Sequence, residues 1–194
     1  MKEKLKNLLS FGNSKVGEDT AIFNMNAAFD CPSEKLNFCA HAKTCYAKKA
    51  ERMYPQALPY RKRQEAYWDS VDVDTFVDEF VEAIRNKKKV PIKYLRISES
   101  GDFKSQNDLD KLNEISDKLK GIVVVYTYTA RKDLSYDKIS DNLIVNGSGF
   151  MVSNNFYIIE KAGDEFDKFV CPGACLTCNL CKRSRSRNIA VLKH

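Results

Sequence analysis

Residues 122–128 read IVVVYTY, and this stretch decides which class of fold to expect. An unbroken run of β-branched and aromatic residues is typical of a strand that is buried on both faces, as the strands of parallel sheets are. Just before it, apolar residues recur at helical spacing over 109–119, and Gly121 suits the end of that helix. A helix that leads directly into an apolar strand indicates an α/β arrangement.

The rest of the chain repeats this alternation. Further strands are predicted at 21–25, 92–97, 143–145, 156–159 and 189–191. Further helices are predicted at 46–53, 60–69 and 76–84, with Asp74 as the N-cap of the last. We therefore expect an α/β fold, a single domain over 1–194 with a mostly parallel sheet. About six strands are too few for an eight-stranded barrel, so the sheet should be either a partial barrel or open.

The composition is that of a soluble globular protein, with 43% hydrophobic and 30% charged residues in 194. No apolar run approaches the ~20 residues that cross a bilayer. Residues 1–10 are basic but lack the apolar stretch of a secretory signal. We therefore expect a cytoplasmic protein with no membrane partner, in a reducing compartment where clustered cysteines hold metal more often than disulfides. The net charge of +6 says little about partners.

Four of the seven cysteines lie within residues 171–181, which we call the C-terminal cysteine run. Its pattern is C-x3-C-x2-C-x2-C, formed by Cys171, Cys175, Cys178 and Cys181. Four neighbouring thiolates repel one another, and a bound metal removes that repulsion while it closes the loop. The short gaps are typical of the wrapping around a [4Fe-4S] cluster, whereas structural zinc sites usually take two ligands from each of two separated turns. The run predicts metal, with iron–sulfur favoured over zinc.

The other three cysteines, Cys31, Cys39 and Cys45, lie in residues 31–45, the N-terminal cysteine loop. With His41 they could form a Cys3His zinc site. Without His41, three thiolates would hold a [4Fe-4S] cluster and leave one iron without a protein ligand. Alternatively, one or two of these cysteines are small buried apolar side chains, and His41 is an exposed residue at the start of a helix.

The division into three and four cysteines suits two metal sites. One would be open, with one iron lacking a protein ligand, and the other closed, with a cysteine on every iron. The alternative is a single shared site with ligands from both ends of the chain. Other chemistry finds little support in the sequence. It holds two histidines, and it contains neither a Ser-His-Asp arrangement nor a Gly-rich phosphate loop.

Two carboxylates, Glu99 and Asp102, follow the predicted strand 92–97 at what would be the carboxyl edge of the sheet. Ligands bind at that edge in α/β folds, although the same residues could cap the next helix. Arg96, within the strand, should pair with one of them, face solvent or bind a substrate anion. The basic stretch 182–187 could contact nucleic-acid phosphates or offset the charge of nearby thiolates.

A strand followed by a three-cysteine loop whose last cysteine adjoins an aromatic residue resembles the opening of the radical S-adenosylmethionine enzymes. The resemblance implies a partial α/β barrel whose three cysteines hold a [4Fe-4S] cluster, with S-adenosylmethionine on the open iron. It also implies cofactor contacts from the strand ends. The matching residues here are Glu99, Gly101, Asp102, Thr127, Thr129 and Asn146. The spacing departs from the usual C-x3-C-x2-C of those enzymes.

Nearly the whole chain also resembles the phage "gene product 88" family. The stretches that carry this resemblance are LSFGNSK (9–15), CYA (45–47), AER (50–52), RISESGDF (96–103), the C-terminal cysteine run and IAV (189–191). The resemblance implies a phage or prophage source, and hence the host cytosol, but it names no substrate.

These observations lead to three expectations about function. The first is an iron–sulfur protein, phage-encoded, that acts as a radical-S-adenosylmethionine-like enzyme with an open cluster and a closed auxiliary cluster. The second is a zinc-stabilised protein without catalysis that binds nucleic acid or a host factor. A third role, in which the metal is only a structural clamp, would make the fold depend on it.

Overall fold

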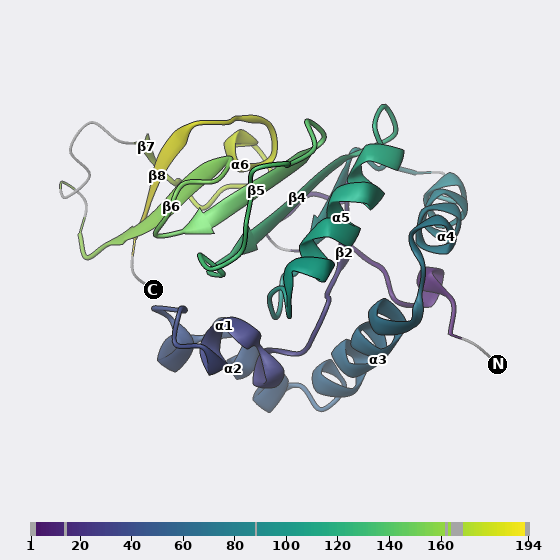
Figure 1. Cartoon of the computed structure of the whole chain (residues 1–194), viewed down its shortest axis with the longest axis horizontal. Coiled ribbons are helices and arrows are strands. Elements are labelled where there is room, and N and C mark those ends of the chain that lie inside the picture. The colour runs from purple at the N-terminus through teal and green to yellow at the C-terminus, as the bar shows by residue number, and fades with distance from the viewer. Residues whose placement is uncertain (1–2, 14, 88, 162, 164–168, 193–194) are drawn as a thin grey trace.

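The architecture rests on one eight-stranded sheet, which a computed structural model describes together with the rest of residues 3–13, 15–87, 89–161, 163 and 169–192. Its strands are β1 (Ser10–Phe11), β2 (Thr20–Phe23), β3 (Tyr94–Ile97), β4 (Val124–Thr129), β5 (Leu143–Ser148), β6 (Asn154–Ile159), β7 (Phe169–Val170) and β8 (Arg187–Leu192). The order is β1-β2-β3-β4-β5-β6-β8-β7, and only the β1–β2 pair is antiparallel in the described chain (Figure 1). Because the two edge strands, β1 and β7, do not pair with each other, the sheet stays open. This confirms the predicted fold class.

Three long helices cover one face of the sheet. They are α3 (Ala57–Ser70), α4 (Val73–Arg85) and α5 (Gln106–Lys118). The expected helices were close to these bounds, with two differences. Helix α3 begins at Ala57 and includes Pro59 in its first turn. Proline is tolerated there because the backbone N–H groups of the first turn have no partner within the helix. Asp72, rather than the predicted Asp74, is the N-cap of α4, since its carboxylate accepts the backbone N–H of Thr75 at 2.8 Å.

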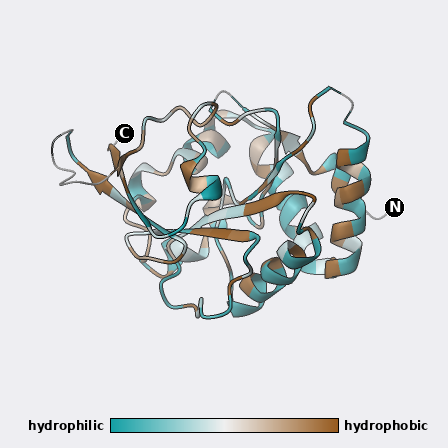
Figure 2. Ribbon diagram, turned by 90° about the horizontal axis from the view of Figure 1, so that it is seen from above, coloured by the Kyte–Doolittle hydropathy of each residue, from teal (hydrophilic) through white to brown (hydrophobic). Residues whose placement is uncertain are grey.

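The main core lies between these helices and the sheet. Its centre is a group of aromatic rings in which Phe23 of β2 contacts Tyr67, Trp68 and Phe76, with ring centroids 5.5–6.1 Å apart. Phe23 and Phe76 are fully buried, as is the Leu95 side chain on β3. Figure 2 shows the apolar residues concentrated on the central strands, with hydrophilic residues on the outer parts of the helices. Apolar burial of this kind stabilises by roughly 1.5–3 kcal/mol per large side chain.

The opposite face of the sheet carries none of the three long helices, and we call it the helix-free face. A smaller apolar group there consists of Tyr94, Tyr126 and Ile144. Above it lie the C-terminal cysteine run and the short helix α6 (Leu180–Arg183), which contacts β4 and β5. A parallel sheet needs cover on both faces, and on this face an irregular cysteine-bearing segment supplies part of that cover.

The predicted strands agree with the structure to within three residues at each end, and the two shortest strands are not predicted by the sequence. β1 and β7 have two residues each, which is too short for a periodic pattern. Within the described residues, no helix is long and apolar enough to span a membrane.

Gly101 gives a direct test of how the β3–α5 loop is built. Its φ is +76°, and a Cβ atom there would lie 1.8 Å from Oδ1 of Asn26, whose side chain bonds both backbone groups of Asp102. We expect Gly101→Ala to lower the free energy of unfolding by roughly 4 kcal/mol, because it adds backbone strain and breaks these buried bonds.

Gly121→Ala is the matched control, since Gly121 has a φ of +82° but open space where the Cβ would be. It should cost about 1–2 kcal/mol, the strain alone. Urea unfolding of both variants measures the difference, and equal losses would contradict the role given to the Asn26 contact.

Candidate metal centre

The N-terminal cysteine loop contains two short helical turns, α1 (Pro32–Lys35) and η3 (Ala42–Thr44). Between β2 and the loop lies η2 (Ala28–Asp30), and α2 (Tyr46–Met53) follows the loop. Cys31 and Cys45 are the N-cap residues of α1 and α2, with nearly equal backbone angles (φ −55°, ψ 119° and φ −59°, ψ 113°). At an N-cap, unpaired backbone N–H groups favour a negative charge. These two sulfurs therefore occupy positions that suit thiolates.

The thiols of this loop are partly buried, and burial opposes ionisation. Burial, with the nearby Asp102 carboxylate, raises the pKa of Cys31 to about 12, while the backbone N–H groups of Glu34 and Ser33 act in the opposite direction. Burial likewise raises the pKa of Cys39, and the backbone N–H of His41 opposes it. Backbone amides directed at sulfur are also found around iron–sulfur clusters.

His41 is the fourth potential ligand of this loop. Its Nε2 atom is buried and has no hydrogen-bond partner in the part of the chain that the structure describes. A buried polar atom without a partner costs free energy unless something binds it. His41 is half-buried and is the N-cap residue of η3, so it stands at the start of a helical turn as one alternative expected, and its role as a ligand stays a prediction.

A buried carboxylate holds the loop in place. Glu51 of α2 accepts the backbone N–H groups of Ala28 and Phe29 at 2.8 and 3.1 Å, and it pairs with Arg61 of α3 at 2.8 Å. The Glu51 side chain is fully buried. Arg61 also donates to the carbonyl of Ala47. This pair fixes α2 and η2 against α3, so the cysteine loop has a rigid support.

The C-terminal cysteine run lies between β7 and β8 on the helix-free face. The backbone N–H of Cys171 donates to Ala190 of β8 at 2.8 Å, and Cys178 donates to Ala174 at 2.9 Å. Burial raises the pKa of Cys171 and of Cys181. The N–H of Gly173 and the hydroxyl of Tyr128 favour the respective thiolates.

Two cations adjoin this run, Lys182, which is buried, and Arg183, which is exposed. Lys182 is 2% exposed, and its Nζ is 4.7 Å from the ring centroid of Tyr94 and 3.5 Å from the Thr20 hydroxyl. It makes no ion pair with any described carboxylate. Arg183 donates from Nε to the Tyr94 hydroxyl at 2.5 Å. Positive charge is therefore concentrated next to Cys181, and no carboxylate of the described chain neutralises it.

Arg96 lies between the two cysteine groups. Burial opposes the charge of Arg96, but its pKa is raised by the nearby Tyr46, Tyr126, Tyr128 and Glu99. Two of these residues belong to the cysteine groups, since Tyr46 follows Cys45 and Tyr128 donates to Cys181. The closest carboxylate oxygen, on Glu99, is 3.6 Å from Nη1. Nε is buried without a hydrogen-bond partner in the described chain. The guanidinium can therefore accept a further anion.

All seven thiols are free. Neighbouring thiols add to the pKa rise that burial causes. Cys39 raises the pKa of Cys31, and Cys45 raises that of Cys39. Cys175 raises the pKa of both Cys171 and Cys181. Across the described residues, no three His, Cys, Asp or Glu side chains converge closely enough to hold a metal ion. The donor set is nevertheless sulfur-rich, which suits iron–sulfur clusters or zinc and not a hard cation.

The sequence proposed six residues as cofactor contacts, and the structure gives five of them internal partners. The Thr129 hydroxyl accepts the backbone N–H of Arg131 at 3.0 Å. Asp102 accepts the Ser33 hydroxyl at 2.5 Å and the Ala130 N–H at 2.8 Å, and Gly101 packs on Asn26. Thr127 donates to the carbonyl of Ile97, and Asn146 donates to the carbonyls of Thr127 and Cys181.

Glu99 is different, because its carboxylate is half-buried and accepts only from Asn13 and weakly from Arg96 in the described chain. Its backbone carbonyl accepts the Tyr46 hydroxyl at 2.6 Å. Tyr46 and Lys182 were not singled out by the sequence as site residues. Tyr46 had the signal of adjoining Cys45, whereas the burial of Lys182 depends on tertiary packing and has no sequence signal.

The basic stretch 182–187 is used largely within the fold. Arg185 donates to the backbone carbonyls of Ser140, Asp141 and Leu143 at 2.9–3.0 Å. With Lys182 buried and Arg183 bound to Tyr94, these side chains tie the last strand to the sheet. Arg183, Arg185 and Arg187 are nevertheless exposed, so a contact of this stretch with nucleic-acid phosphates stays a prediction.

The pKa of Cys31 predicts how the metal-free protein reacts with alkylating agents. Because the thiolate is the nucleophile, a pKa of about 12 should keep Cys31 labelling slow, with a rate that rises about tenfold per pH unit from pH 8 to pH 10. Peptide mass spectrometry after iodoacetamide pulses measures this. An ordinary thiol, with a pKa of about 8.5, reaches a plateau above about pH 9.5, and such a plateau at Cys31 would contradict the burial described.

Comparison with known proteins adds one relationship. A family model described as "Gene product 88" matches residues 3–170, which includes the N-terminal cysteine loop but ends just before Cys171. No curated protein and no solved structure matches the chain.

Proposed function

The chain belongs to the Gene product 88 family, and we propose that it is an iron–sulfur protein with two sites. Cys31, Cys39 and Cys45 would hold an open [4Fe-4S] cluster. The C-terminal cysteine run, with its four thiolates, would hold a closed one. The observation that carries the proposal is the buried Lys182 next to Cys181, which has no carboxylate partner in the described residues.

An unpaired buried charge costs several kcal/mol, so a folded protein rarely retains one. A metal centre with four thiolate ligands carries net negative charge, whether the metal is a [4Fe-4S] cluster or zinc. Such a centre would neutralise Lys182 and Arg183. It would also release the thiol protons that burial otherwise retains on Cys171 and Cys181.

We further propose that the open site serves a radical-S-adenosylmethionine-like activity. A [4Fe-4S] cluster on three cysteines supplies a one-electron reductant with an iron that is free for an external ligand. The chain's own residues would orient that ligand. Glu99 offers a carboxylate for an amino group, and Tyr46 fixes the Glu99 backbone. Arg96 offers its free Nε to a carboxylate on the helix-free face.

The test of the metal assignment is the iron and acid-labile sulfide content of anaerobically purified protein, with its visible spectrum. We expect about eight of each per chain with a broad band near 400 nm, as two Cys-bound [4Fe-4S] clusters require. Replacing Cys31, Cys39 and Cys45 by Ser should halve both values. Replacing the four C-terminal cysteines should halve them as well. Zinc without sulfide would overturn the proposal.

Lys182 gives a second test, in which the direction of the effect separates two explanations. If Lys182 neutralises a thiolate centre, Lys182→Met should speed the loss of the cluster to an iron chelator by about tenfold, while Lys182→Arg retains it. If no anionic centre exists, removing an unpaired buried charge should stabilise the protein. A higher unfolding midpoint for Lys182→Met with unchanged metal content would contradict the proposal.

The second candidate is a zinc-stabilised binding protein. The observation in its favour is the Gly173 N–H directed at Cys171, an arrangement that also suits a zinc-bound turn. Zinc in the C-terminal run with no sulfide in either group would support it.

A further inference from the structure

The segment of residues 29–54, from η2 through α2, carries an unusual share of exposed apolar side chains. They are Phe29 (40% exposed), Leu36 (47%), Tyr46 (60%), Met53 (57%) and Tyr54 (52%). Three of the five are aromatic. Exposed apolar groups that cluster on one element mark a binding surface more often than groups scattered singly.

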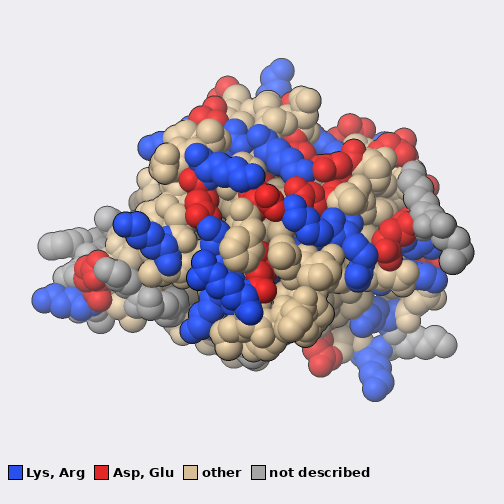
Figure 3. All heavy atoms as spheres, turned by 90° about the horizontal axis from the view of Figure 1, so that it is seen from below, with Lys and Arg blue, Asp and Glu red and all other residues tan. Residues whose placement is uncertain are grey.

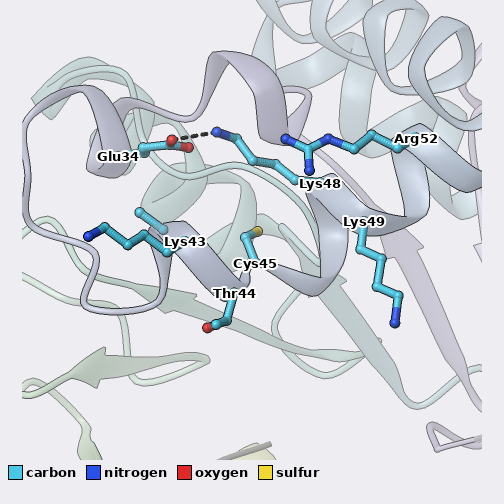
Figure 4. A pocket seen from close by; sticks show the side chains of 8 residues that line it. Glu34, Lys43, Thr44, Cys45, Lys48, Lys49 and Arg52 are labelled. Atoms are coloured by element: carbon cyan, nitrogen blue, oxygen red, sulfur yellow. Dashed lines mark hydrogen bonds and ion pairs between the residues drawn. The ribbon is translucent and has the colours of Figure 1, made fainter.

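The same segment forms a hollow of about 400 Å³, which we call the basic hollow. It is lined by Glu34, Ala42, Lys43, Thr44, Cys45, Lys48, Lys49 and Arg52. Figure 4 shows Lys48 bound to Glu34 and the Arg52 guanidinium extending along α2 toward Lys48. Figure 3 views the side on which Figure 1 places α1 and α2, and Lys and Arg side chains form several groups there.

The charges of the hollow are only partly neutralised. Four cations line it against one carboxylate, and that carboxylate, Glu34, pairs with Lys48. Lys43, Lys49 and Arg52 are exposed and form no ion pair with a described residue. Three positive charges around a concave surface attract a polyanion, and the attraction depends on salt.

Aromatic rings adjoin these cations. Lys48 and Arg52 lie over the ring of Phe29, with charged groups 5.5 and 5.6 Å from its centroid. Tyr46 and Tyr54 stand at either end of α2. A basic groove flanked by exposed aromatic rings is the usual combination in proteins that bind single strands, because phosphates contact the cations and unpaired bases stack on the rings.

We propose that the basic hollow binds single-stranded nucleic acid, with phosphates on Lys43, Lys49 and Arg52 and a base on Phe29. A duplex hides its base faces and gives the exposed rings nothing to stack on. None of the side chains that would contact the strand is a proposed metal ligand. Because Cys45 lines the hollow, the bound strand would lie beside the open cluster, and its role as substrate rests on the proposed function.

The test is fluorescence anisotropy with labelled 20-nucleotide dT and U strands in 50–200 mM KCl, on anaerobically purified protein. For the triple variant Lys43→Gln/Lys49→Gln/Arg52→Gln we expect at least tenfold weaker binding. We also expect a salt slope smaller by about 2, since each lost phosphate contact removes about 0.7 on single strands. Cys45 is retained, so the iron content should not change.

The matched control removes the same number of exposed charges elsewhere, with Lys87→Gln/Lys89→Gln/Lys120→Gln. Lys87 and Lys89 line a separate hollow beside Phe11. This variant should keep the wild-type salt slope. Equal losses in both triple variants would show binding through net charge alone and overturn the proposal.

Two further measurements test whether a base stacks on Phe29 and whether the hollow prefers single strands to other polyanions. Phe29→Leu keeps apolar volume but removes the stacking surface, and we expect roughly tenfold weaker binding to the strands with an unchanged salt slope. Polyglutamate and phosphatidylserine vesicles are the competing partners. If they bind through the hollow while both strands fail to bind, the proposal is wrong. If the strands bind but the iron is absent, the binding site stands and the proposed function fails.

Discussion

The buried charge of Lys182 is the constraint on which this structure depends. A parallel sheet must be covered on both faces, and the helix-free face here is covered in part by a cysteine run that brings Lys182 and Arg183 onto Tyr94. The tyrosine rings offset part of the cost of this charge through cation–π contacts. A centre of four thiolates would offset the rest. In the proposed function, the C-terminal segment would both cover this face of the sheet and bind the metal that offsets the charge of Lys182.

At the carboxyl edge of the sheet, polar residues serve to build the cysteine loop. The Asn26 side chain binds both backbone groups of Asp102, and the Asp102 carboxylate accepts the backbone N–H of Ala130. Glu51 joins η2, α2 and α3. Because these groups are hydrogen-bonded within the protein, they hold the cysteine loop in position. Arg96 and Glu99 differ, since Arg96 keeps a buried Nε without a partner in the described chain and Glu99 keeps a half-buried carboxylate. They lie between the two cysteine groups.

The sequence predicted what depends on local pattern and missed what depends on tertiary contact. The apolar run at 122–128 found β4, and the bounds of α2 were predicted correctly because cysteine and proline frame it. The placement of Asp102 inside the protein could not be predicted, because a carboxylate after a strand suits a ligand site equally well. The same limit applies to Lys182, which reads as part of an exposed basic stretch and is instead buried.

The most direct measurement of the central claim is hydrogen exchange across residues 169–192 in protein with its metal and after removal by a chelator. If a thiolate-bound metal neutralises Lys182 and fixes the cysteine run, its removal should abolish protection in this segment. The core strands β2 and β3 should stay protected, because the aromatic core holds them. Protection that is the same in both samples would contradict the claim that metal completes this face of the sheet.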